Sequence, residues 1–96
     1  MTNERSIMGK KEMNLETVKG ELKEILIESL ELDKTKDEID GNDLINELSI
    51  NSIDALEILV RVETKYDIII PDEDLSASLI SSLDGFAHYI IGRCQE

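Results

Sequence analysis

The sequence predicts an all-α fold, a four-helix bundle with three longer helices and one short third helix. Apolar residues recur at three- and four-residue steps in separate stretches, which is typical of helices that bury one face. A single proline and five glycines leave long stretches free to be helical. With 96 residues, 41% of them hydrophobic, the chain suits one compact domain.

The first helix is predicted from Leu15 to Leu30. Asn14 is a suitable cap, and Glu16 lies in the first turn, where a negative charge suits the helix dipole. The buried stripe of this helix is expected to combine Leu15, Val18, Leu22, Ile25, Leu26 and Leu30. Residues 1–13 lack this periodicity, so we expect a flexible tail before a domain that spans residues 14–96.

Residues 31–51 are rich in Asp, Lys, Asn and Gly and predict a long loop, with a short turn near Leu44 and Ile45. Scattered apolar residues are expected to hold this loop to the core: Ile39, Leu44, Leu48 and Ile50.

A second helix is predicted from Ser52 to Tyr66. Its apolar side is expected to contain Ile53, Leu56, Leu59, Val60, Val62 and Tyr66. The opposite, polar stripe is expected to contain Asp54, Glu57, Arg61 and Lys65. Within that stripe Glu57 and Arg61 can pair one turn apart, whereas Glu63 is expected near an edge of the apolar side.

The Ile68–Ile70 run is interpreted as a buried, extended link, because Pro71 follows it directly. A short third helix is predicted from Glu73 to Ala77, with Asp72 as its cap. The last helix is predicted from Leu83 to Gly92, with Ser82 as its cap. The inner face of the last helix is expected to contain Leu83, Phe86, Ala87, Ile90 and Ile91.

The charge balance excludes some classes of partner. The net charge is −12, from 22 acidic and 10 basic residues, which argues against binding nucleic acid or anionic membranes. It favours partners with basic surfaces. The one cysteine, Cys94, cannot form an internal disulfide, and no apolar run approaches a membrane span. We therefore expect a cytoplasmic protein, monomeric and not inserted in a membrane.

Catalysis and metal binding find little support in the residues. His88 is the only histidine, and no nucleophile-elbow motif surrounds Ser52, so a serine hydrolase lacks a base near its serine. A calcium loop counted from Asp33 would need Gly at its sixth position and Glu at its twelfth, but Glu38 and Leu44 stand there. One cysteine and one histidine cannot form a zinc site.

Ser52 offers a different chemistry, because it lies where a loop becomes a helix. A helix N-terminus presents free backbone N–H groups and partial positive charge, which together stabilise a phosphate. A phosphodiester on Ser52 would be well placed. The alternative is that Asn51 or Ser52 merely caps the helix, since Asn51 and Asp54 resemble a weak capping box. The residues alone leave both possibilities open.

The run from Leu48 to Glu57, followed by the run from Tyr66 to Asp74, resembles the acyl carrier protein family. That family shows an Asp-Ser-Leu motif at its second helix, then an acidic amphipathic helix and an Ile-Pro-Asp-Glu segment. Ser81-Ser82-Leu83 and Ala87-His88-Tyr89-Ile90 resemble its last helix. The resemblance covers residues 14–92 and implies a four-helix fold of acyl-carrier-protein type.

The resemblance implies a carrier that performs no chemistry itself. A phosphopantetheinyl transferase would attach 4'-phosphopantetheine to Ser52, between Asn51 and Ile53, and the arm would hold an acyl group as a thioester. An acyl cleft would be lined by Leu56, Leu59, Val62, Ile69 and Leu83. Docking to acyl synthases, transferases or ligases with basic surfaces would use Asp54, Glu57 and Arg61. The pathway would be fatty-acid, polyketide or related lipid synthesis.

The sequence departs from the family pattern beside the serine. Asn51 replaces the usual Asp, and Ile53 replaces Leu. Because the Asp helps to engage the transferase and its metal, we expect slower modification or a dedicated transferase. Arg61 and Lys65 place cations on a mostly acidic stripe, which indicates a narrower partner set. Asn51 also motivates an alternative function, an unmodified acyl-carrier-like helical module for protein interaction.

Overall fold

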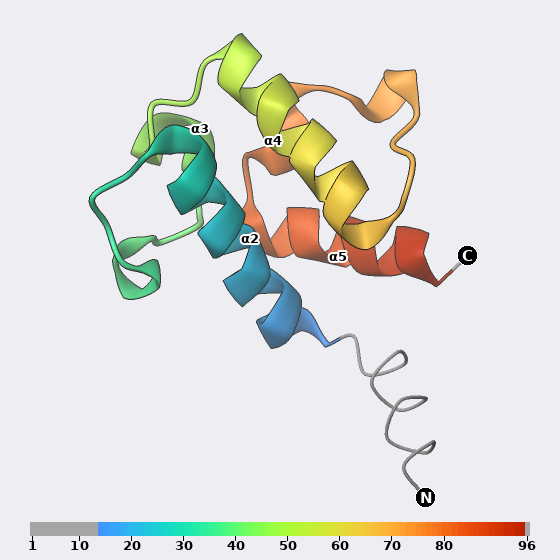
Figure 1. Cartoon of the computed structure of the whole chain (residues 1–96), viewed down its shortest axis with the longest axis horizontal. Coiled ribbons are helices and arrows are strands. Elements are labelled where there is room, and N and C mark those ends of the chain that lie inside the picture. The colour runs from blue at the N-terminus through green and yellow to red at the C-terminus, as the bar shows by residue number, and fades with distance from the viewer. Residues whose placement is uncertain (1–13, 96) are drawn as a thin grey trace, which may run out of the picture.

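The computed structural model describes residues 14–95 and contains four α-helices in that range, as the sequence predicts (Figure 1). They are α2 (Leu15–Leu30), α3 (Leu44–Glu47), α4 (Ser52–Tyr66) and α5 (Leu83–Cys94). Three 3-10 turns accompany them: η1 (Lys36–Glu38), η2 (Asp72–Asp74) and η3 (Ala77–Ile80). The expected tail, residues 1–13, lies outside the described residues.

The bounds of α2 and α4 match the predicted helices, and the predicted caps are confirmed at two helix starts. The Asn14 side chain accepts a hydrogen bond from the backbone N–H of Thr17 at 2.8 Å. The Ser82 hydroxyl accepts one from Gly85 at 3.1 Å. Both bonds satisfy backbone donors that the first helical turn leaves without a partner. The last helix ends at Cys94, beyond the predicted Gly92.

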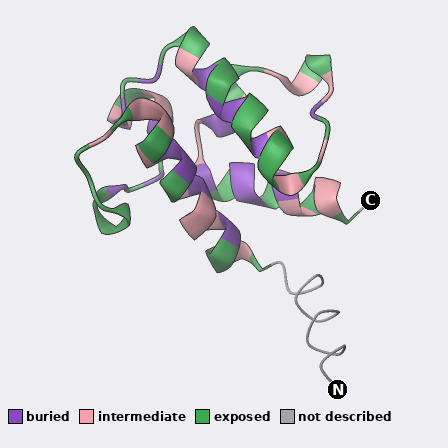
Figure 2. Cartoon of the chain, in the orientation of Figure 1, coloured by how far each residue is buried: buried purple, intermediate pink, exposed green. Residues whose placement is uncertain are grey.

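Helix α2 packs against both α4 and α5, and the three long helices share one apolar core (Figure 1). Buried residues recur along each of the three long helices, between exposed ones (Figure 2). Phe86 is the largest of them, and among the described residues no polar or charged side chain is buried. At the edge of the core Tyr66 donates a hydrogen bond to Glu21 at 2.6 Å, which joins α4 to α2. Burial, and secondarily this bond, raise the pKa of Tyr66.

The long loop between α2 and α4 is attached to the core as expected. Its four predicted anchors, Ile39, Leu44, Leu48 and Ile50, are all buried. The Glu47 carboxylate accepts bonds from the backbone N–H groups of Asp40 and Gly41 at 2.7 and 3.0 Å. Gly41 has a φ of +90°, and a Cβ there would lie 3.0 Å from the Leu83 Cβ. The loop therefore fits closely against the start of α5.

Three local predictions are wrong. The short α-helix lies at α3, whereas the predicted helix from Glu73 to Ala77 is replaced by the turns η2 and η3. Asp72 is accordingly not a cap but the first residue of η2, after Pro71. Three consecutive acids offer no apolar stripe with which a longer helix could pack.

The link before Pro71 is only partly buried. Ile70 is buried, whereas the side chain of Ile69 is 76% exposed. In an extended segment successive side chains point to opposite sides, so one of two neighbours faces the solvent.

The apolar side of α4 is the third correction. The structure buries Ala55, Ile58, Leu59 and Val62. Three residues predicted for the core are instead exposed: Ile53 by 77%, Leu56 by 53% and Val60 by 50%. Helix α4 therefore carries two apolar stripes, one facing the core and one facing solvent. We call them the inner stripe (Ala55, Ile58, Leu59, Val62) and the outer stripe (Ile53, Leu56, Val60).

Candidate functional site

Ser52 is exposed and is the first residue of α4. The preceding residue, Asn51, caps the helix, because its side-chain oxygen accepts a hydrogen bond from the backbone N–H of Asp54 at 2.7 Å. Within residues 14–95 the Ser52 hydroxyl makes no hydrogen bond. Asn51 therefore caps the helix, and the Ser52 hydroxyl is available to form a covalent bond.

The start of α4 favours an anion at Ser52. The backbone N–H of Ala55 donates to the backbone carbonyl of Asn51 at 2.9 Å. The backbone N–H of Asp54 donates to the side-chain oxygen of the same residue. In the described part of the chain, the N–H groups of Ser52 and Ile53 have no hydrogen-bond partner. These two donors, together with the positive end of the helix dipole, suit a phosphate oxygen. The site thus fits a phosphodiester on Ser52.

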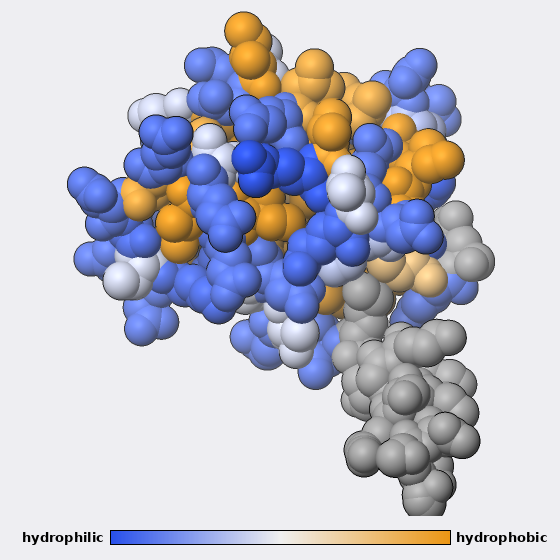
Figure 3. All heavy atoms as spheres, in the orientation of Figure 1, coloured by the Kyte–Doolittle hydropathy of each residue, from blue (hydrophilic) through white to orange (hydrophobic). Residues whose placement is uncertain are grey.

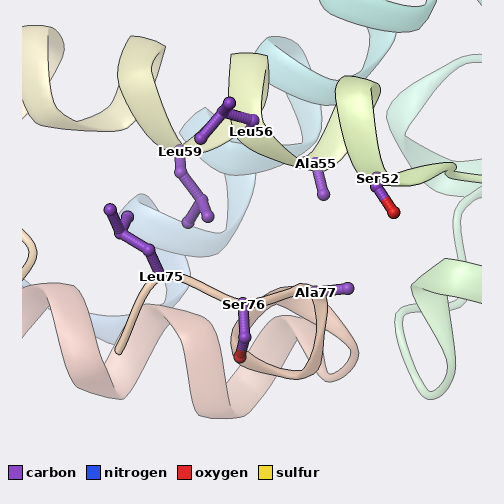
Figure 4. A pocket seen from close by; sticks show the side chains of 7 residues that line it. All are labelled: Ser52, Ala55, Leu56, Leu59, Leu75, Ser76 and Ala77. Atoms are coloured by element: carbon purple, nitrogen blue, oxygen red, sulfur yellow. The ribbon is translucent and has the colours of Figure 1, made fainter. Parts of the chain in front are cut away.

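A pocket of about 290 Å³ lies beside Ser52 (Figure 4). One wall comes from α4, with Ser52 at one end of the row and Leu59 at the other. The opposite wall comes from the η2–η3 segment. The residues that line the pocket are Ser52, Ala55, Leu56, Leu59, Leu75, Ser76 and Ala77. The mostly apolar walls suit a hydrocarbon group.

The residues expected to line an acyl cleft are distributed over three environments. Leu56 and Leu59 line the pocket beside Ser52. Val62 and Leu83 are buried members of the core. Ile69 is exposed on the link after α4 and does not line this pocket.

Several lining residues escaped prediction. Ala55 belongs with Ile58, Leu59 and Val62 to a regular pattern of three- and four-residue steps, so the sequence carried a signal for it. Leu75, Ser76 and Ala77 occur in and between 3-10 turns, which have no apolar periodicity to detect.

The outer stripe forms an apolar surface next to Ser52. Figure 3 shows apolar side chains gathered over α4 among polar neighbours. Asp54 and Glu57 lie on the same helix, half-exposed and exposed respectively. Leu56 takes part in both features, because it lines the pocket and is also half-exposed. A partner that covers this surface would approach Ser52 as well.

Arg61 lies beside two carboxylates at the surface. Its Nε lies 3.3 Å from Glu57 Oε2, which confirms the predicted pair, and its Nη1 lies 4.0 Å from Glu28 Oε1 on α2. Lys65 lies over the Tyr66 ring, 5.8 Å from its centroid. Arg61 therefore partly neutralises acids of the same chain, whereas Lys65 contacts an aromatic ring.

A second groove, of about 410 Å³, runs between α2 and α4. Its lining is mainly charged and consists of Glu21, Glu24, Ile25, Glu28, Val60, Arg61, Thr64 and Lys65. Its carboxylates and cations lie on facing helices, so this groove suits a hydrocarbon group less than the pocket at Ser52.

The other chemically active side chains do not line the pocket at Ser52. His88 is exposed on α5 and lies 3.5 Å from Asp84 of the same helix. Burial raises the pKa of the Cys94 thiol, which makes it a weaker nucleophile near neutral pH. Across residues 14–95 no cluster of three or more metal-ligating side chains is found. In the same range no helix has the length and apolar character needed to cross a membrane.

Comparison with known proteins adds to this geometry. The family model described as "Phosphopantetheine attachment site" matches residues 20–90. The acyl carrier protein of Chloroherpeton thalassium is 30% identical over 79 residues, covering 82% of this chain and 95% of that protein. The acyl carrier protein of Karelsulcia muelleri is 37% identical over 71 residues, covering 74% of this chain and 82% of its own length.

The acyl carrier protein of Clostridium acetobutylicum is 29% identical over 75 residues, covering 78% of this chain and 94% of that protein. The matched range contains α4, Ser52 and both walls of the pocket. The chain belongs to the phosphopantetheine-binding acyl carrier protein family.

Proposed function

We propose that Ser52 carries 4'-phosphopantetheine through a phosphodiester bond. The observation that carries this proposal is the division of roles at the start of α4, where Asn51 caps the helix and leaves the Ser52 hydroxyl exposed. The free N–H groups of Ser52 and Ile53 support a phosphate at the same place.

The family defines the general function. The chain contains a phosphopantetheine attachment site and is a non-catalytic carrier of acyl groups. A phosphopantetheinyl transferase and acyl-handling enzymes are its partners. The prosthetic arm supplies a terminal thiol, which holds the acyl group as a thioester. The protein's own residues hold the arm, shelter the cargo and present both to other enzymes.

The pocket beside Ser52 is our candidate for the acyl cleft. Leu56, Leu59 and Leu75 give it apolar walls, and Ser52 at its edge places a bound arm next to its mouth. Burying a hydrocarbon chain there removes about 25 cal/mol of unfavourable hydration for each Å² of apolar surface covered. The proposed cleft uses Leu56 and Leu59 and does not include Ile69, which faces solvent.

The outer stripe is our candidate for the docking surface. It combines exposed apolar side chains with Asp54 and Glu57, close to the attachment serine. The matching partner surface is an apolar depression bordered by basic residues. Charges of this kind mainly raise the association rate and set orientation. Arg61 pairs with Glu57 at the surface, and exposed pairs of this kind are weak, so Glu57 remains open to a cation of the partner.

The same features suit a cytoplasmic monomer. The net charge of −12 makes copies of the chain repel one another. Both the thiol of the arm and the unpaired Cys94 are stable in a reducing compartment. Fatty-acid, polyketide and related lipid synthesis all use such carriers.

The attachment site is tested by incubating the apo protein with coenzyme A, magnesium and a broad-specificity transferase, then measuring the intact mass. We expect one phosphopantetheine adduct on the wild type and none on Ser52→Ala. Ser49→Ala is the matched control, because Ser49 is exposed in the same motif but lies before the helix. An adduct that persists in Ser52→Ala would refute the assignment.

A further inference from the structure

One wall of the pocket at Ser52 is a helix, but the other is a segment of short turns. We call this second wall the turn wall; it consists of Leu75, Ser76 and Ala77. The turn wall lies within residues 71–80, which contain η2 and η3 but no α-helix. Short turns are intrinsically less rigid than a packed helix, so the shape of the pocket depends on how this segment is attached to the bundle.

The backbone bonds in this segment are local. Each backbone N–H donates to the carbonyl oxygen three residues earlier. These bonds run from Asp74 to Pro71 at 2.8 Å, from Leu75 to Asp72 at 3.1 Å, and from Leu79 to Ser76 at 3.1 Å. Bonds of this kind shape each turn, and a backbone bond to another element follows only at the end of η3, where the Ser81 carbonyl accepts from the Leu44 N–H at 2.7 Å. Apolar packing of Leu75 and Ile80 against the core provides part of the attachment.

Tyr89 attaches the turn wall to α5 through a hydrogen bond directly before Leu75. This residue of α5 donates a hydrogen bond from its hydroxyl to Asp74 Oδ2 at 2.8 Å, and both side chains are half-buried. Asp74 directly precedes Leu75, the largest side chain of the turn wall. The acceptor is a carboxylate, and hydrogen bonds to ionised acceptors are stronger than those between neutral groups. The Tyr89–Asp74 bond thus fixes the backbone from which Leu75 extends.

We propose that Tyr89 is a specificity-determining residue, which positions the Leu75 wall through Asp74 and thereby restricts the pocket to short and medium acyl chains. The inference rests on the proposed function, in which this pocket holds the acyl group. At about 290 Å³ the pocket lies at the lower end of ligand-binding cavities. A longer chain requires the wall to move outward, and that movement has to break or stretch the Tyr89–Asp74 bond.

The test compares protein loaded with butanoyl, octanoyl or hexadecanoyl phosphopantetheine. Two quantities are measured for each: the rate at which hydroxylamine cleaves the thioester, and the shift in the unfolding midpoint relative to the unacylated holo protein. The wild type is expected to protect the octanoyl group best. In Tyr89→Phe the protection of hexadecanoyl relative to octanoyl is expected to rise about fivefold, the order of one partly exposed hydrogen bond to a charged group.

The chain offers a matched control. Tyr66→Phe also removes a tyrosine–carboxylate bond between two elements, the 2.6 Å bond to Glu21, but this bond joins α4 to α2 and does not attach the segment that carries Leu75. We expect it to keep the wild-type chain-length profile. Asp74→Ala should reproduce Tyr89→Phe, and Asp74→Asn, which retains an acceptor oxygen but loses the charge, should lie between Asp74→Ala and the wild type. These two variants carry the test if Tyr89→Phe fails to fold.

The outcomes separate the two levels of the proposal. A folded Tyr89→Phe, or the Asp74→Ala variant, with an unchanged chain-length profile would overturn the role of Tyr89. An equal change in Tyr66→Phe would also overturn it, since general loosening would then explain the effect. A wild type that gives all three acyl groups the same protection would instead refute the acyl cleft itself, whereas the mass experiment on Ser52 would still report the attachment site.

Discussion

The two apolar stripes of α4 lie only part of a helical turn apart, but their environments are opposite. The inner stripe is buried, and its Ile58 has no exposed surface. The outer stripe consists of the same residue types, yet Ile53, Leu56 and Val60 are at least half exposed. The comparison teaches that apolar residues on this helix serve two purposes. One set holds the bundle together, and the other is available to partners beside Ser52.

The comparison predicts a graded series of effects on the free energy of unfolding. The largest is expected at the centre of the inner stripe. Ile58→Ala should lower the stability by about 2–5 kcal/mol, because it removes a fully buried aliphatic side chain and leaves a cavity. Urea denaturation measures the change. A loss below about 1 kcal/mol, the range of exposed positions, would show that the inner stripe is not the structural one.

The next largest effect is expected at the helix start, where both stripes begin. Asn51→Ala removes the acceptor for the Asp54 N–H and should cost about 1 kcal/mol. Asn51→Asp retains the acceptor and should stay within about 0.5 kcal/mol of the wild type. It also restores the residue usual in the family, so its loading by the transferase should be faster. Equal loading rates for Asn and Asp would show that the charge at this position is unimportant.

The outer stripe should contribute little to folding. Leu56→Ala is expected to change the unfolding free energy by no more than about 0.5–1 kcal/mol, because the side chain is already half exposed. Ile58→Ala, two residues along the same helix, is the variant with which Leu56→Ala is compared. If both substitutions cost the same in thermal and urea unfolding, the distinction between the stripes fails.

The smallest effect on stability, and a large one on binding, is expected for Glu57→Lys. Its side chain is exposed, so the helical circular-dichroism signal should stay the same. Association with a basic partner such as the transferase should slow by about tenfold at low salt, and the difference should shrink as salt is added. Asp37→Lys changes the net charge equally but lies on η1. Equal slowing in both variants would assign the effect to net charge rather than to docking.

Much of the fold could be predicted, because caps and helical periodicity are local. Asn14, Asn51 and Ser82 all accept the bonds expected of caps, and α2 and α4 have the predicted bounds. Periodicity reveals that a stripe exists but not which stripe meets the core when a helix has two. That choice is made by tertiary packing, which explains why the apolar side predicted from periodicity includes the exposed Leu56 and Val60 but not the buried Ile58.

The candidate site also has a part that the sequence predicts and a part that it does not. Ser52 could be recognised from its place at a helix start and from the motifs around it. The turn wall could not, because Leu75 and Ala77 meet the pocket through 3-10 turns without a repeating pattern. The bond between Tyr89 and Asp74 joins residues 15 positions apart, and no local rule pairs them.

The central claim, that Ser52 holds the prosthetic arm, is tested most directly by the intact mass of the protein purified from its native host, followed by peptide mapping. Our account predicts a phosphopantetheine adduct, with or without an acyl group, on the peptide that contains Ser52. A wholly unmodified native population would contradict it and would favour an unmodified helical interaction module. An adduct on any other serine would contradict the assignment of the site.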